Sequence, residues 1–388
     1  MSTSLAELDL ASWRGAEAIR ANHARLLVLL RLGDTPIGKL ELPSAGGVPD
    51  GRELRQRIAA RFGYDIWTQR ALAALPSPAT ARAPSATVVI CTRERPDDLR
   101  KCLGAVCALP DDGQDVLIVD NNPRTTATFD VAREFPQVRY ALEDQPGLNA
   151  ARNRALREAR GAVLAFVDDD AVVDRNWLRA LLRPFEDPEV QAVTGLTMPL
   201  ELETPAQELF ESLTGFSRRG FKRRVFVWPP HDPLSAGAVG AGANMAIRRS
   251  VVDVIGEFDP ALDAGTASES GGDHEFFSRI LRRGYRIVYE PGALNWHRHR
   301  RTDEELHRAL YGYGVGAYAS WTRTLMDGEW GVVRQAWWWL SRQQAPGVLR
   351  LMFRRGSRFE RRLQLGELLG CLRGPGRYLA ARRKLRVA

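Results

Sequence analysis

The stretch AVLAFVDDD, residues 162–170, decides the fold and indicates the chemistry. Its first six residues are apolar and include β-branched and aromatic side chains, which is typical of a short buried strand. Three aspartates follow: Asp168, Asp169 and Asp170. Burial strengthens the repulsion between carboxylates, so we expect a positive group beside them, most simply a hard divalent cation that also binds phosphate oxygens. A solvated acidic turn would give the same triplet, so the neighbouring segments must distinguish the two.

Segments on both sides of this strand alternate between strand and helix patterns. Strands are predicted at 87–91, 116–119 and 138–141, and helices at 97–108, 131–135 and 149–159. This alternation predicts an α/β fold with a mostly parallel, doubly wound sheet, in which ligands bind beyond the carboxyl ends of the strands. Three polar clusters stand at such ends: 91–93, 120–122 and 168–170. We therefore expect one site at this edge of the sheet.

The chain extends beyond this sheet at both ends. Residues 1–75 are expected to form a small α+β accessory region, a hairpin with strands at 26–32 and 37–42 followed by a helix at 52–75. The Pro-, Ser- and Ala-rich residues 76–86 are predicted to be a linker. The catalytic domain would then span 87–310, and 311–388 would form a helical, basic, aromatic-rich extension.

Composition limits the class of protein. Of 388 residues, 44% are hydrophobic and 26% charged, which suits a globular fold. No apolar run reaches the ~18 residues of a membrane-spanning helix, and the first residues lack a signal-peptide pattern. We expect a cytoplasmic protein, with association at the inner face of the membrane left open. The net charge of +8 suits nucleic acid, anionic lipid or phosphorylated ligands, or reflects composition alone.

The order of the motifs resembles that of inverting family 2 glycosyltransferases with the GT-A fold, over roughly residues 86–325. The segments that carry the resemblance are 92–96, 119–122, 147–153, 168–170, 242–246, 271–276 and 291–297. The resemblance implies a metal-dependent, hexosyltransferase-type enzyme. Its donor would be a nucleotide diphosphate sugar, most simply a UDP-sugar. Its acceptor would be a hydroxyl of a glycan, a lipid-linked glycan or a small secondary metabolite.

Three residues are expected to hold the metal. Asp170 would bind it directly, Asp168 would face the metal or the ribose, and His297 would add a nitrogen ligand by its position in the last motif. Mg²⁺ and Mn²⁺ both suit carboxylate and phosphate oxygens. Alternatively, His297 is a surface histidine in the basic run 297–301.

The resemblance also implies a set of nucleotide-binding residues: Thr92, Arg93, Asp120, Asn149, Arg152, Asp168 and Asp169. Asp120 would accept a hydrogen bond from uracil, although an Asx-turn beside Asn121 would also explain it. Arg93 and Arg152 could be solvated helix-end cations. Asn149 could simply cap its helix.

Asp273 is the candidate general base that removes the proton of the acceptor hydroxyl. A helix N-cap role is compatible with this function. The family usually has Glu-Asp where this chain has Gly272-Asp273, so Glu275 is a candidate replacement for the missing carboxylate. Asn244, Glu275 and Trp228 are expected on the acceptor side, Trp228 within a basic, aromatic segment, 199–233, that could form a lid.

Other functions are set against this hypothesis. A nucleotidyltransferase would need a Gly-rich triphosphate loop with a lysine, and residues 91–95 lack one. Residues 168–172 formally fit the motif of a phosphatase with an aspartyl nucleophile. The motif follows the fourth predicted strand rather than the first, which counts against this function. A third alternative is a non-enzymatic basic protein that binds lipid or nucleic acid. We expect no nucleic-acid partner, and the sequence does not predict the oligomeric state.

The C-terminal extension has two open interpretations. Its arginines alternate with leucine and phenylalanine: Arg350, Arg354, Arg355, Arg358, Arg361 and Arg362. Such a pattern suits amphipathic helices on an anionic membrane. It also suits packing on the catalytic domain, with the arginine stems covering apolar surface.

Overall fold

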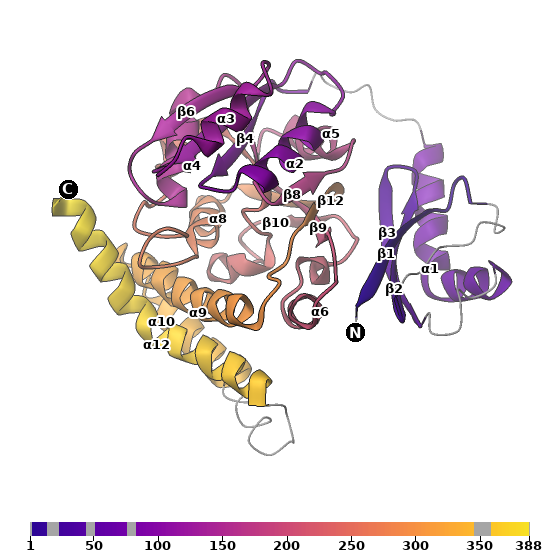
Figure 1. Cartoon of the computed structure of the whole chain (residues 1–388). Helices are drawn as coiled ribbons and strands as arrows, with labels where there is room; N and C mark the ends of the chain where they lie inside the picture. Colours follow the sequence, from indigo (N-terminus) through magenta and orange to yellow (C-terminus); the bar gives the residue numbers. More distant parts are fainter. Residues whose placement is uncertain (1, 14–22, 44–50, 76–82, 345–357, 388) are drawn as a thin grey trace.

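The computed structural model describes residues 2–13, 23–43, 51–75, 83–344 and 358–387. Within these residues a nine-stranded central sheet carries helices on both faces (Figure 1). A three-stranded sheet with one helix lies against one side of this body, and long helices lie against another. The predicted linker residues 76–82 and Arg350, Arg354 and Arg355 lie outside the described residues.

One half of the central sheet is parallel, as predicted. Its strands are β7 (Val163–Asp168), β4 (Ala86–Thr92), β5 (Asp115–Asn121) and β6 (Arg139–Glu143), in that order. Three helices connect them: α2 (Pro96–Cys107), α3 (Ala127–Arg133) and α4 (Leu148–Glu158). The apolar sides of α2 and α3 pack on one face of the sheet and that of α4 on the other.

The other half of the sheet is mixed. From the edge inward it runs β10 (Arg224–Phe226), β12 (Arg286–His297), β9 (Val190–Pro199) and β11 (Asn244–Arg248), and β11 is antiparallel to both β9 and β7. A short strand, β8 (Ala171–Val173), pairs with the end of β12. Glu290 and Leu294 of β12 pair with the consecutive residues Gly195 and Leu196, so residues 291–293 form a bulge.

The segment 199–233, which the sequence suggested to be loop-rich, contains regular structure. It holds β10 and the helix α6 (Pro205–Leu213), which begins with a capping box between Thr204 and Gln207. Two further helices pack on opposite faces of the sheet: α5 (Trp177–Leu182) on the face that α2 covers, and α7 (Val252–Ile255) on the face that α4 covers.

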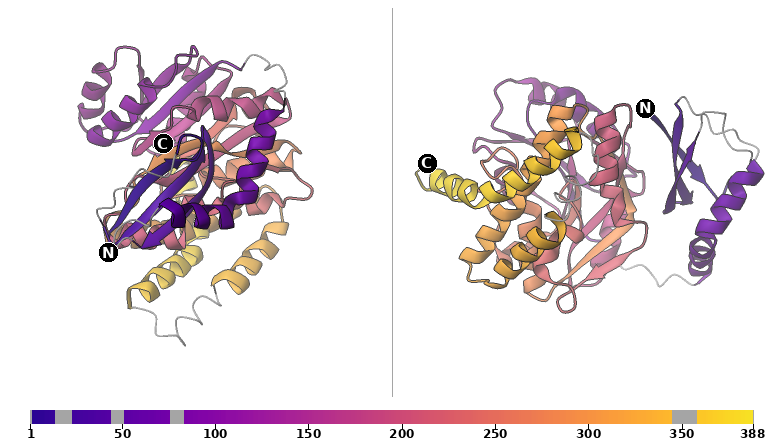
Figure 2. Two further views of the ribbon diagram at one scale, coloured as in Figure 1. Left: turned by 90° about the vertical axis from the view of Figure 1, so that its right-hand side faces the viewer. Right: turned by 90° about the horizontal axis from the view of Figure 1, so that it is seen from below.

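The N-terminal unit consists of β1 (Thr3–Asp9), β2 (Arg25–Leu32), β3 (Thr35–Pro43) and α1 (Gly51–Ala74). The hairpin of β2 and β3 and the helix were predicted, whereas β1, parallel to β2, was not. Alternate residues of β2 face opposite sides. Leu26, Val28 and Leu30 pack toward α1, and Leu27 and Leu29 join the core of the central body. Figure 2 shows this small sheet lying across the side of the body.

Polar contacts fix the N-terminal unit to the body. Arg31 Nη1 lies 2.6 Å from Asp174 Oδ2, and Lys39 Nζ lies 2.8 Å from Glu211 Oε1. Both carboxylates are buried. The unit is therefore docked through apolar contacts and two ion pairs that are largely shielded from water.

The C-terminal part contains α8 (Gly272–Arg282), α9 (Asp303–Met326), α10 (Gly331–Trp339) and α12 (Arg358–Val387). Glycines let α9 and α12 approach closely. A Cβ on Gly314 would lie 2.2 Å from the Glu367 carbonyl oxygen, and one on Gly370 would lie 2.2 Å from that of Tyr311. The extension thus packs on the body through α9. No helix among the described residues is both long enough and apolar enough to cross a membrane.

Candidate active site

The three polar clusters predicted at strand ends lie together at one edge of the sheet. Parallel pairing sets Thr92 of β4 opposite Asp120 of β5, and Cys91 opposite Asp168 of β7. The Thr92 hydroxyl donates a 2.7 Å hydrogen bond to Asp169 Oδ2, which ties the first loop to the aspartate triplet. Arg93 is half-buried beside Thr92.

Asp168, Asp170 and His297 form a group with the spacing of a metal site. Because β8 pairs with β12, Ala171 lies opposite His297 and the imidazole faces the triplet. One ligand atom from each residue lies within 4.8 Å of the others, and His297 Nε2 is 3.1 Å from Asp170 Oδ1 and 3.7 Å from Asp168 Oδ2. Asp170 Oδ1 is buried and receives no hydrogen bond. Two carboxylates and an imidazole suit Mn²⁺ or Mg²⁺.

Two arginines that the sequence analysis did not select balance this charge. Arg95 Nη1 lies 3.1 Å from Asp169 Oδ1 and 3.2 Å from Asp170 Oδ2, and Arg300 Nη1 lies 3.7 Å from Asp170 Oδ2. The excess of carboxylates could have indicated them, since Arg95 lies in the first motif, 92–96, and Arg300 lies in the basic run 297–301. Their place beside the aspartates depends on the fold.

Asp169 and Asp170 differ in protonation behaviour. Burial, and then the charge of Asp170, raise the pKa of Asp169 to about 7. Burial also favours a higher pKa for Asp170, but His297, Arg300 and Arg95 outweigh it and hold that pKa below its usual range. Burial favours a lower pKa for His297, but Asp170 and Asp168 raise it to about 9. Of Asp169 and Asp170, Asp170 is thus the more persistent anion.

Asp120 lies at the buried end of β5 with one oxygen unused. The Tyr140 hydroxyl donates a 2.9 Å hydrogen bond to Asp120 Oδ2, while Oδ1 is buried and has no partner among the described residues. Burial raises the pKa of Asp120. The next residue, Asn121, accepts a hydrogen bond from the Gly147 amide at 2.8 Å and so holds the third motif beside the second. The unused oxygen of Asp120 is free to accept from a ligand N–H.

The polar residues of α4 hold a neighbouring loop. Arg152 Nη1 contacts Asp263 Oδ2 at 2.7 Å and Asn149 Oδ1 at 3.0 Å, and Asn149 donates to the Asp259 carbonyl at 2.9 Å. Arg152 is buried, rather than a solvated cation. These contacts fix the segment that leads into α8.

Asp273 lies in the first turn of α8, and backbone amides donate hydrogen bonds to both of its carboxylate oxygens. Its Oδ2 accepts from the Gly242 amide at 2.7 Å, and its Oδ1 accepts from the His274 amide at 2.8 Å. Burial favours a higher pKa, but His274, Arg152 and these amides together hold the pKa of Asp273 below its usual range. The carboxylate is therefore ionised and able to accept a proton.

The three residues expected on the acceptor side lie in different surroundings. Asn244 is buried in β11, where it accepts from Trp177 Nε1 at 2.8 Å and donates to the Ala293 carbonyl at 2.8 Å. Glu275 is buried in an ion pair with Arg279 at 2.8 Å. Trp228 is exposed on the loop after β10. The structure does not bring these three side chains together.

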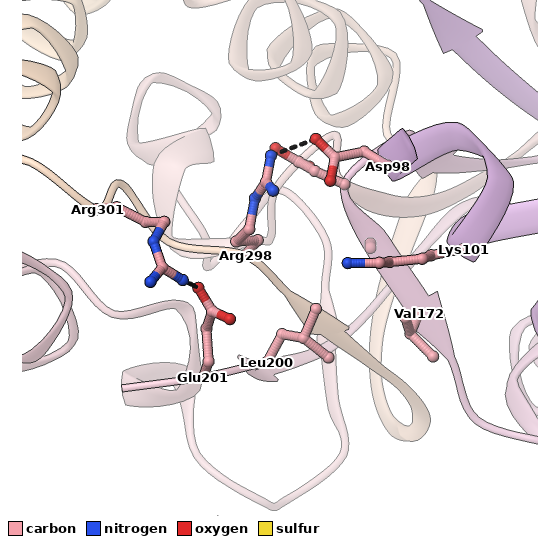
Figure 3. A pocket seen from close by; sticks show the side chains of 9 residues that line it. Asp98, Lys101, Val172, Leu200, Glu201, Arg298 and Arg301 are labelled. Atoms are coloured by element: carbon pink, nitrogen blue, oxygen red, sulfur yellow. Dashed lines mark hydrogen bonds and ion pairs between the residues drawn. The ribbon is translucent and has the colours of Figure 1, made fainter. Parts of the chain in front are cut away.

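Two pockets flank the aspartates. The larger, of about 380 Å³, lies between Arg95, Arg300 and α9, and Glu269, Arg308 and Tyr313 line it further out. The smaller, of about 130 Å³, lies on the other side of Asp170. Figure 3 shows its ion pairs, Arg298 with Asp98 and Arg301 with Glu201, and Lys101 extending into the same space. Only the larger pocket approaches the size of a small-molecule site.

The chain is similar in sequence to known glycosyltransferases. Residues 87–256 match the model of glycosyl transferase family 2. Glycosyltransferase AglE of Haloferax volcanii is 27% identical over 62% of this chain and 76% of its own length. The pre-mycofactocin glycosyltransferase of Mycobacterium tuberculosis is 29% identical over 72% of this chain, and the match spans only 58% of that relative.

A solved structure supports the fold. The mannosyltransferase PcManGT from Pyrobaculum calidifontis, in complex with GDP-Man and Mn²⁺, superimposes with a TM-score of 0.52 at 17% identity, covering 81% of this chain and 96% of that one. The protein described here is a glycosyltransferase with the GT-A fold. The match of residues 87–256 to glycosyl transferase family 2 agrees with the family that the order of the motifs indicated.

Proposed function

We propose that this glycosyltransferase transfers a sugar from a nucleotide diphosphate donor, most simply a UDP-sugar, to a hydroxyl acceptor with inversion at the anomeric carbon. The observation that carries the donor proposal is the group of Asp168, Asp170 and His297 at the carboxyl edge of the sheet, in which Asp170 and His297 are buried. A glycan, a lipid-linked glycan and a small secondary metabolite are the acceptor classes considered.

The donor side supplies charge and base recognition. Asp168, Asp170 and His297 would hold the divalent ion, which when bound stabilises the negative charge of the leaving diphosphate. Arg95 and Arg300 lie beside the aspartates and offer further positive charge to phosphate oxygens. The unused oxygen of Asp120 suits a uracil N–H.

The acceptor side supplies a base. Asp273 is ionised and held by two backbone amides, so it can take the proton of an acceptor hydroxyl as that oxygen attacks the anomeric carbon. A positioned general base contributes about 10²–10⁴-fold. A single displacement from the face opposite the leaving diphosphate inverts the anomeric centre. The 380 Å³ pocket beside α9 is the proposed entrance for the acceptor.

Thermal unfolding with UDP, GDP and dTDP, each with and without Mn²⁺, tests the donor proposal. Binding to the folded state alone adds about 2.7 kcal/mol at a hundredfold excess over Kd, so we expect UDP with Mn²⁺ to raise the Tm by several degrees. UDP without metal should give a much smaller rise. If none of the three nucleotides shifts the Tm in either condition, the donor proposal is wrong.

Two variants separate binding from chemistry. Asp170→Asn should lose the metal-dependent part of the shift. Asp273→Asn should keep the metal-dependent Tm shift. Its rate of sugar transfer, measured as UDP released from the donor when hydroxyl acceptors are supplied, should fall at least about a hundredfold. Unchanged turnover in Asp273→Asn would assign the base to another group without affecting the donor proposal.

A further inference from the structure

Helix α12 has two apolar faces, and only one of them is covered. Leu363, Cys371, Tyr378 and Ala381 are buried. A second set of leucines is exposed by 39% to 67%: Leu365, Leu369, Leu372 and Leu379. At 3.6 residues per turn these leucines fall on one stripe, on the side of the helix opposite the buried set. A helix that merely packs on its neighbour would carry polar residues there.

Cations border the leucine stripe on both sides. The sequence of α12 contains eight arginines and one lysine against two glutamates. The helical period places Arg361 and Arg386 along one border of the stripe, and Arg362 and Arg373 along the other. Between Leu365 and Leu379 the exposed face of α12 is therefore apolar along its middle and basic along both edges, and the exposed Arg383 adds a cation on the line of the stripe at its C-terminal end.

Helix α10 repeats this pattern with aromatic residues. Trp330, Val333 and Trp337 are exposed by 75%, 53% and 68%, and their spacing places them on one side of the helix. Val332 is buried, and the Trp339 ring packs 6.0 Å from those of Tyr318 and Trp321 of α9. Exposed tryptophans are typical of protein surfaces at the level of lipid headgroups.

The chemistry of these faces selects one occupant. Apolar stripes bordered by cations, with neighbouring tryptophans, fit a bilayer surface that offers acyl chains below anionic headgroups. Nucleic acid offers nothing for the leucines to bury against. A second copy would bring two arginine-bordered stripes together, with like charges opposed. Since no described helix can span a bilayer, contact would occur at the surface.

We propose that α12 and α10 dock this enzyme on an anionic membrane surface, with Leu365, Leu369, Leu372 and Leu379 inserted at the headgroup level. This inference goes beyond the proposed function and does not depend on the identity of the donor. Figure 1 shows α12 along the outer edge of the body, where a flat surface can reach it.

Flotation of the full chain with vesicles tests this proposal. Vesicles of phosphatidylcholine containing phosphatidylglycerol should carry the protein to the top of a sucrose gradient, and vesicles of phosphatidylcholine alone should carry much less. Raising the salt concentration should weaken binding. The double variant Leu369→Glu/Leu372→Glu should reduce the partition coefficient tenfold or more, because roughly two leucine side chains no longer leave water.

A matched control uses the double variant Leu213→Glu/Val254→Glu, which places the same charges on exposed apolar positions of α6 and α7. It should float like the unchanged protein, and circular dichroism should show both variants folded. The proposal is overturned if the protein does not float with anionic vesicles, or if both double variants lose binding equally. It is also overturned if the α12 variant only converts a dimer to a monomer in sedimentation velocity.

Discussion

Gly272, next to the proposed base, shows how one residue shapes the site. A Cβ there would lie 2.3 Å from Asn149 Nδ2 and 2.6 Å from Asp263 Oδ2, so a larger residue would displace these two side chains. The carboxylate that lies in this space belongs to Asp263, which Arg152 binds at 2.7 Å. Glu275 is engaged by Arg279 instead. Asp263 is thus the second acid beside Asp273, although it is ten residues away in the sequence.

Removing Arg152 should shift the pH dependence of transfer. Arg152 lowers the pKa of both Asp263 and Asp273, against the effect of burial. In Arg152→Met the pKa of Asp273 should rise, and because the base works deprotonated, the acidic limb of the kcat/KM profile should move up by roughly one pH unit or more.

The matched control is Arg154→Met, which removes an exposed ion pair with Glu158 on the same helix. Its pH profile should match that of the unchanged enzyme. A profile of Arg152→Met that falls in height without moving along the pH axis would mean that Arg152 affects transfer only through structure.

Among the elements, α9 and α12 depend on close backbone contact. Gly370 and Gly374 of α12 would each place a Cβ within 2.6 Å of a carbonyl oxygen of α9. Backbone cannot rotate away as a side chain can, so these positions allow no side chain. Gly376 lies on the exposed side of α12 with open space around its Cβ position.

Gly370→Ala should therefore reduce the free energy of unfolding by about 1–3 kcal/mol, the usual effect of overpacking. Gly376→Ala on the same helix should leave it unchanged or raise it by up to about 1 kcal/mol, because alanine favours the helix. Urea denaturation followed by circular dichroism measures both. Equal effects of the two substitutions would show that α12 is not held through the Gly370 contact.

The elements also show what the sequence could and could not predict. Strands β4, β5 and β7 follow from local patterns, because each is a short apolar run before a polar cluster. His297, which lies 3.1 Å from Asp170, could be selected from the sequence only by its position in the last motif. Its contact depends on the pairing of β8, three residues long, with the end of β12. The predicted site did not include Arg95, Arg300 and Tyr140. Their ion pairs and hydrogen bonds with the aspartates depend on the three-dimensional fold and cannot be predicted from local sequence patterns.

At the scale of the whole molecule, the N-terminal unit is linked to the site through buried charge. Lys39 Nζ contacts Glu211 Oε1 at 2.8 Å, and Glu211 Oε2 lies 3.1 Å from His299 Nε2. His299 stands two residues after His297 in the same extended segment. Burial favours a higher pKa for Glu211, but His299 and Lys39 hold it below its usual range. Docking of the unit and the position of this segment are thus coupled.

Lys39→Met should destabilise the protein by about 3 kcal/mol, because it leaves Glu211 buried with less compensation. The loss should be smaller at low pH. The depressed pKa of Glu211 means that its ion pair stabilises the fold above the unfolded pKa and is lost as pH falls through the folded one. Denaturation at several pH values measures this, with the exposed pair Arg57–Glu53 as control: Arg57→Met should change stability by at most about 0.5 kcal/mol. If Lys39→Met changed the free energy of unfolding as little as Arg57→Met, the Lys39–Glu211 ion pair would contribute little to docking of the N-terminal unit.

The bulge at 291–293 has an evolutionary consequence. It divides β12 into two stretches. The upstream stretch, residues 286–290, pairs with β9, whereas the terminal stretch, residues 294–297, pairs with β9 and, from residue 295 on, also with β8. Successive strand residues point to opposite sides, so the phase of the last stretch alone determines whether the imidazole faces the aspartates. Substitutions in the upstream stretch can therefore accumulate without turning His297 away. By contrast, a one-residue shift of the terminal stretch along β8 would leave the upstream pairing intact and yet turn the His297 imidazole away from the aspartates.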